Sequence, residues 1–136
     1  MRALPPKSRE NMVFRVDEGM LARFGDRPIH PVLSTWSLVY HLEWVARCLL
    51  ERCLESGEEG AGAGVDVRHL APAPLGAEVF VEAELLRQES GRFVCAVRAS
   101  CDGRPIATGT VYQAVLADDR LSRLWAAGSH RPGSED

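Results

Sequence analysis

The chain has 136 residues, of which 46% are hydrophobic and 26% charged, a composition typical of one globular domain with its own core. The formal net charge of −3 argues against a non-specific nucleic-acid binder, which needs a surplus of basic residues. No run of about 18 apolar residues predicts a membrane span, and residues 1–10 lack the apolar run of a signal peptide.

The N-terminal part predicts a flexible lead over residues 1–9 and a strand over Asn11–Asp17, where Met12, Phe14 and Val16 alternate. The segment Glu18–Ile29 is ambiguous and has room for one helical turn before residues 25–28 break it. We expect the single domain to run from residue 10 to residue 127, with residues 128–136 as a disordered tail.

A long helix is predicted from Ser34 to Ser56, with Gly57 as its stop. Either Ser34 or Thr35 caps its N-terminus, because both hydroxyls suit that position. The helix is apolar almost all round, which predicts that other elements cover it on more than one side.

One acid interrupts this apolar pattern. Glu43 shares a helical face with Trp36, Ala46 and Leu50, where an unpaired carboxylate costs several kcal/mol. The simplest explanation is an ion pair with Arg47, four residues further on. The alternative is that the carboxylate has a function.

The remainder of the chain is predicted to be β-structure, ending in a short helix over Asp118–Ala127. Ser90-Gly91 and Asp102-Gly103 lie between alternating runs and are typical of tight hairpin turns, so three consecutive strands form an antiparallel meander. The predicted strands are Val65–Leu70, Glu78–Arg87, Phe93–Cys101 and Ile106–Leu116.

One long buried helix with an antiparallel sheet curled around it is an α+β arrangement known as the hot-dog fold. A cystatin-like or cone-shaped α+β fold is the structural alternative.

The cysteines predict no metal site, because Cys48, Cys53, Cys95 and Cys101 form no CxxC pair and no ligand grouping. We expect reduced thiols and a cytoplasmic location. The glycine-rich stretch 57–64 follows a helix and precedes a strand, the reverse of a phosphate-binding turn, and is better explained as a flexible connection.

The chain resembles the hot-dog thioesterases of the fluoroacetyl-CoA thioesterase type, over roughly residues 12–117. The family's threonine at the helix entrance, glutamate eight residues later and histidine on the following strand correspond here to Thr35, Glu43 and His69. The family's acyl-pocket glycine, seven residues before the histidine, corresponds to Gly62. The resemblance is carried by Ser34-Thr35, Leu42-Glu43-Trp44, residues 62–64, residues 67–76 and residues 81–85.

This resemblance implies an acyl-CoA thioesterase that needs no cofactor and acts as a homodimer with sites at the subunit boundary. Glu43 either attacks the thioester carbonyl or acts as a base on water, His69 moves protons, and backbone N–H groups around Thr35–Ser37 stabilise the oxyanion. Taken without the resemblance, His69 is more readily explained as a structural, hydrogen-bonded histidine than as a catalyst.

The segment before Thr35 points to the substrate. The family's lid phenylalanine is missing from Pro28–Leu33, so we predict a short- or medium-chain acyl-CoA substrate without fluoroacetyl specificity. Ile29 and His30 lie near the site mouth and are predicted substrate contacts. Nothing in the spacing selects the arginines that meet the coenzyme A phosphates: Arg68, Arg98 and Arg104 are the candidates.

One structural question and two alternative functions stay open. Trp36, Tyr40 and Trp44 are either core or subunit contacts. The same pocket in a non-catalytic protein would bind an acyl-CoA or acyl thioester without turnover. A hot-dog hydratase is the third possibility, but its aspartate–histidine motif is missing from this sequence.

Overall fold

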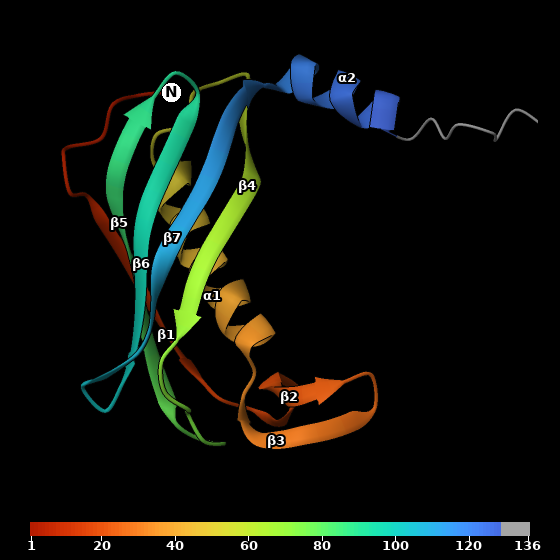
Figure 1. Cartoon of the computed structure of the whole chain (residues 1–136). Helices are drawn as coiled ribbons and strands as arrows, with labels where there is room; N and C mark the ends of the chain where they lie inside the picture. The colour runs from red at the N-terminus through yellow and green to blue at the C-terminus, as the bar shows by residue number, and fades with distance from the viewer. Residues whose placement is uncertain (129–136) are drawn as a thin grey trace, which may run out of the picture.

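The computed structural model describes residues 1–128, and its central feature is one helix packed against one face of a sheet (Figure 1). The sheet is antiparallel, with the strand order β1-β5-β6-β7-β4. Its strands are β1 (Arg9–Arg15), β4 (Glu58–His69), β5 (Glu78–Glu89), β6 (Arg92–Cys101) and β7 (Arg104–Ala117). The helix is α1 (Thr35–Glu51), so the hot-dog fold predicted from the sequence is confirmed.

The meander forms as the turn residues predict. Ser90 and Gly91 have φ of 48° and 73°, and Asp102 and Gly103 have φ of 51° and 75°. These positive values are those of the turn whose twist matches two adjoining antiparallel strands. The predicted face of β5 is the core face, because Val79, Val81, Ala83 and Leu85 are all buried.

The ambiguous segment resolves into a 3-10 turn, η1 (Glu18–Met20), followed by a separate hairpin of β2 (Leu21–Phe24) and β3 (Arg27–Leu33). Gly25 makes the turn with φ of 59°. The hairpin lies beside the N-terminal end of α1 in Figure 1.

Two predicted boundaries were wrong. The glycine-rich stretch 58–64 is not a flexible connection but the first half of β4, paired with β7 and interrupted by a bulge between Gly62 and Gly64. Small side chains hide the alternation that normally identifies a strand. The helix ends at Glu51 rather than near Ser56, because the chain must turn back early to begin this longer strand.

The covering of α1 is also less complete than predicted. Leu38, Leu42, Val45 and Leu49 are fully buried against the sheet. The side chains of Trp36, Tyr40 and Trp44 are 44%, 60% and 50% exposed. One chain therefore leaves one face of the helix open.

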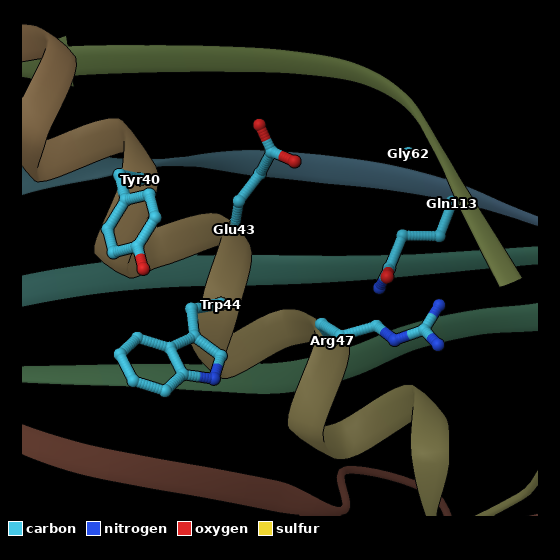
Figure 2. Close-up of a pocket in the computed structure, with 6 residues that line it drawn as sticks. All are labelled: Tyr40, Glu43, Trp44, Arg47, Gly62 and Gln113. Carbon is cyan, nitrogen blue, oxygen red and sulfur yellow. The ribbon is translucent and has the colours of Figure 1, made fainter.

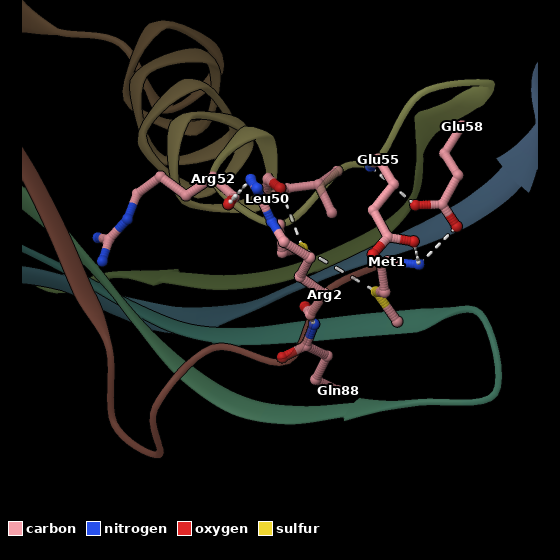
Figure 3. A network of polar contacts seen from close by, with 8 residues as sticks. Met1, Arg2, Leu50, Arg52, Glu55, Glu58 and Gln88 are labelled. Carbon is pink, nitrogen blue, oxygen red and sulfur yellow. Dashed lines mark hydrogen bonds and ion pairs between the residues drawn. The ribbon is translucent and has the colours of Figure 1, made fainter.

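The lead segment has defined partners at the far end of α1 (Figure 3). The Met1 amine donates to Glu58 at 2.5 Å, and the Leu4 N–H donates to Gln88 Oε1 at 2.9 Å. The Gln88 amide also donates to the Arg2 carbonyl. These contacts tie the segment predicted as a loose lead to β4 and β5.

The terminal helix forms as predicted, as α2 (Asp118–Gly128), which extends away from the sheet beyond β4 in Figure 1. The predicted tail lies outside the described residues, apart from Gly128. No helix within residues 1–128 is long and apolar enough to cross a membrane.

Candidate active site

The N-terminus of α1 meets the end of β4, and this contact joins the first two candidate residues. Ser34 is the cap, because its side chain accepts a hydrogen bond from the Ser37 N–H at 3.1 Å. Thr35, as the first helical residue, is thereby left free to turn its hydroxyl elsewhere. Its Oγ1 lies 2.9 Å from His69 Nδ1 at the end of β4.

The Thr35–His69 contact has two chemical forms. Either the threonine hydroxyl donates to Nδ1, or Nδ1–H donates to the hydroxyl, according to the imidazole tautomer. In the first form His69 is placed to take a proton from the Thr35 oxygen. The other ring nitrogen, Nε2, is buried and has no hydrogen-bond partner among residues 1–128. A buried orphan nitrogen is costly, which is a reason to regard this imidazole as functional.

The start of α1 offers backbone N–H groups that can stabilise an oxyanion, but fewer than expected over Thr35–Ser37. The first N–H groups of a helix have no intrahelical partner. Ser37 N–H is taken by the Ser34 hydroxyl, which removes it as a donor. The Thr35 and Trp36 N–H groups have no hydrogen-bond partner among residues 1–128. Thr35 lines a cavity of about 330 Å³, together with Val32, His69, Leu70, Ala71 and Pro72.

Glu43 lies two turns further along α1, roughly 12 Å by helical rise. The prediction of a buried acid was wrong, since Glu43 is exposed in the single chain, on the helix side that passes over the edge of the sheet at β4. The predicted ion pair with Arg47 is also not formed. Arg47 instead donates to Glu51, Glu59 and the Gly60 carbonyl.

The cavity beside Glu43 is built by the glycine predicted to belong to it. A Cβ on Gly62 would lie 3.3 Å from Glu43 Oε2, so the missing side chain makes room for the carboxylate. Figure 2 shows this space between α1 and the strands. The cavity has a volume of about 320 Å³, and its lining residues are Tyr40, Glu43, Trp44, Arg47, Gly62 and Gln113.

The structure thus brings the predicted residues together in pairs. Thr35 pairs with His69, and Glu43 pairs with Gly62. No hydrogen bond or ion pair within the described part of the chain joins Glu43 to Thr35 or His69. Ile29 and His30 lie apart from both pairs, exposed on β3, where they line a third cavity of about 430 Å³ with Leu75.

One residue of this site was missed in the sequence. Gln113 lies on the inner face of β7, 5% exposed, and its Nε2 donates to the Ala46 carbonyl at 3.1 Å. The available signal was its place in the alternating row Gly109, Val111, Val115, where an apolar residue is expected.

Among residues 1–128, no group of three or more His, Cys, Asp or Glu side chains is placed to hold a metal ion. The four cysteines are free thiols. Burial raises the pKa of the Cys95 thiol to about 12, so it stays protonated and is a poor ligand or nucleophile.

Solved structures place this fold in a class. A thioesterase superfamily member from Thermus thermophilus is 33% identical, with a TM-score of 0.90 over 93% of this chain and 94% of its own. The fluoroacetyl-CoA thioesterase FlK is 26% identical, with a TM-score of 0.83 over 94% and 99% of the two chains. A hot-dog-like protein from Thermanaerovibrio acidaminovorans is 27% identical, with a TM-score of 0.82 over 93% and 95%. These similarities define a hot-dog protein of the thioesterase superfamily.

The particular family follows from a family-level match. Residues 16–119 match the fluoroacetyl-CoA-specific thioesterase family, and the chain belongs to that family. A comparison with curated proteins found no match.

Proposed function

We propose that this protein is an acyl-CoA thioesterase that hydrolyses a short- or medium-chain acyl thioester. The observation that carries the proposal is the 2.9 Å contact between Thr35 Oγ1 and His69 Nδ1 at the start of a helix. It supplies a hydroxyl, a proton carrier and free backbone N–H donors at one point, which is what acyl transfer requires. Membership of a thioesterase family supports the same chemistry.

In this proposal the thioester carbonyl binds beside the N-terminus of α1. The Thr35 and Trp36 N–H groups stabilise the oxyanion, helped by the positive end of the helix dipole. Glu43 lies about 12 Å along its own helix from Thr35, so it acts on this carbonyl from the second copy of a homodimer, either as the nucleophile or as the base that takes a proton from water. In the base route the water oxygen forms the new C–O bond as Glu43 takes its proton; in the nucleophile route a Glu43 oxygen forms that bond, and water then hydrolyses the resulting anhydride and gives its proton to His69. In both routes the C–S bond breaks and the coenzyme A thiolate leaves with a proton from His69, which the proton released by water replaces.

The hairpin before α1 supports a substrate other than fluoroacetyl-CoA. Pro28–Leu33 lies within β3 and contains no phenylalanine, and Phe24, on the neighbouring strand, is 74% exposed. We therefore expect similar rates with fluoroacetyl- and acetyl-CoA. A preference for the fluorinated ester of about a thousandfold or more would contradict this expectation. We place Ile29 and His30 in contact with the pantetheine or acyl part of the substrate, on the cavity they line.

We also propose a homodimer, with a second copy covering the open face of α1. Trp36, Tyr40 and Trp44 expose an apolar stripe there, and β4 is a long edge strand. A second copy at this face would also close the cavity around Glu43.

The four free thiols support a cytoplasmic location.

The experiment that tests the proposal is the release of free coenzyme A from acetyl-, fluoroacetyl-, butyryl-, hexanoyl- and benzoyl-CoA. Glu43→Gln and His69→Ala should each lower kcat by about a hundredfold or more, because each removes a group that moves protons. Glu89→Gln, at an exposed position at the end of β5, is the matched control. Blanks without substrate correct for the protein's own four thiols.

Binding separates the two functional classes. Glu43→Gln should still bind a non-hydrolysable acyl-CoA analogue, measured by calorimetry. Binding by the wild type without turnover of any ester would contradict the hydrolase and favour an acyl-CoA binding protein.

A further inference from the structure

The Glu43 cavity contains a polar group that the proposed hydrolysis does not use. Gln113 is buried on the core face of β7, opposite Gly62 in the β4–β7 register. A buried amide costs free energy unless its polar atoms are paired. Only one of the two polar atoms of Gln113 has a partner within residues 1–128.

The paired atom fixes which way the amide points. The Ala46 carbonyl is an acceptor, so the atom facing it at 3.1 Å must be the amide nitrogen, Nε2. The carbonyl oxygen, Oε1, is the other atom. It accepts no hydrogen bond from any described residue, and it is not sealed in the core, because Gln113 lines the cavity with Glu43. Figure 2 shows both side chains bordering this space.

The one cation of this cavity is already neutralised. Arg47 Nε donates to Glu51 at 3.3 Å, and its two terminal nitrogens donate to the Gly60 carbonyl at 2.8 Å and to Glu59 at 2.7 Å. The same carboxylates raise the pKa of Arg47. The charged and amide groups that remain free among the described lining residues are therefore acceptors: the Glu43 carboxylate and Gln113 Oε1.

We propose that this cavity takes an acyl group that carries a hydroxyl, which donates a hydrogen bond to Gln113 Oε1. Tyr40 and Trp44 contribute apolar surface for the carbon chain. A carboxylate on the acyl chain is disfavoured, because it would face the charge of Glu43 while Arg47 is already paired with other groups. The inference rests on the proposed thioesterase function and names the substrate class within it.

The test compares acyl groups of equal length. Butyryl-CoA, 3-hydroxybutyryl-CoA, 4-hydroxybutyryl-CoA and succinyl-CoA are hydrolysed by the wild-type protein under the same conditions. We expect kcat/KM for at least one hydroxybutyryl ester to exceed that for butyryl-CoA by about fivefold or more, the effect of one net hydrogen bond. Succinyl-CoA should be about tenfold worse than butyryl-CoA.

A variant assigns the preference to this residue. Gln113→Met keeps the length of the side chain but removes the carbonyl, so the ratio of hydroxybutyryl to butyryl kcat/KM should fall to about one. Gln88→Met makes the same change on β5 and should leave the wild-type ratio intact. If Gln113→Met fails to fold, the wild-type comparison still decides.

Measurements of acyl-CoA binding to the Glu43→Gln variant distinguish a failure of this inference from a failure of the proposed thioesterase function. If butyryl-CoA is hydrolysed but neither hydroxybutyryl ester is preferred, only the present inference is overturned. If nothing is hydrolysed, calorimetry decides it: tighter binding of a hydroxybutyryl ester supports the inference, and equal or undetectable binding overturns it.

Discussion

At the scale of single residues, the candidate site depends on one missing side chain. Gly62 sits at a bulge of β4, and a Cβ there would approach Glu43 Oε2 to 3.3 Å. Such a contact is tight enough to move the carboxylate by a few tenths of an ångström. Catalysis is sensitive to displacements of this kind because the reacting atoms must be aligned.

We therefore predict that Gly62→Ala lowers kcat by about tenfold. Gly64→Ala is the matched control, because its Cβ would meet Tyr112 at an ordinary 3.6 Å. Steady-state kinetics on both variants, with melting temperatures to establish folding, measure the effect. Equal kcat in the two variants would show that Gly62 does not position Glu43.

At the scale of elements, the meander depends on two turns of the same type that differ in their surroundings. Gly91 and Gly103 both have φ near 74°, where an alanine costs about 1 kcal/mol. A Cβ on Gly91 would also lie 3.1 Å from the Val115 carbonyl, whereas nothing lies within 4 Å of one on Gly103.

Gly91→Ala should accordingly destabilise the protein by about 2 kcal/mol and Gly103→Ala by about 1 kcal/mol. Chemical denaturation monitored by circular dichroism gives both values. A larger loss of stability for Gly103→Ala than for Gly91→Ala would contradict this prediction, because the contact with the Val115 carbonyl would then not explain the difference between the two turns.

At the scale of the whole molecule, the open face of α1 decides the assembly. We predict a dimer by analytical ultracentrifugation at micromolar concentration. Trp36→Glu should shift it toward monomer, because a carboxylate would be buried against the second copy. Within a separate monomer the new carboxylate can pair with Arg23, whose guanidinium carbon lies 5.8 Å from the centre of the Trp36 ring. A monomeric wild type would count against the closed site as well.

The burial of the cysteines leads to a second prediction for the whole molecule. Cys53, Cys95 and Cys101 are buried and Cys48 is partly exposed. Burial raises the pKa of Cys48, Cys53 and Cys95, so few thiolates form near neutral pH. Ellman's reagent should label at most Cys48 quickly in the native protein, and all four thiols in concentrated guanidinium. Rapid labelling of two or more would contradict this core.

The sequence by itself determined the features that depend on neighbouring residues. The two turns, the alternating faces of β5 and the start of α1 follow from local backbone preferences and from periodicity. Thr35, Glu43 and His69 are the residues that the resemblance to the thioesterase family implies, and the structure places Thr35 against His69.

Only the tertiary structure decided the rest, because contacts distant in sequence are involved. The partner of the Thr35 hydroxyl is His69, 34 residues away in the chain. The glycine-rich stretch becomes a strand because β7 is there to pair with it. The role inferred for Gln113 depends on Ala46, 67 residues away. The Ala46 carbonyl accepts a hydrogen bond from the amide nitrogen of Gln113, which leaves the amide oxygen facing the cavity.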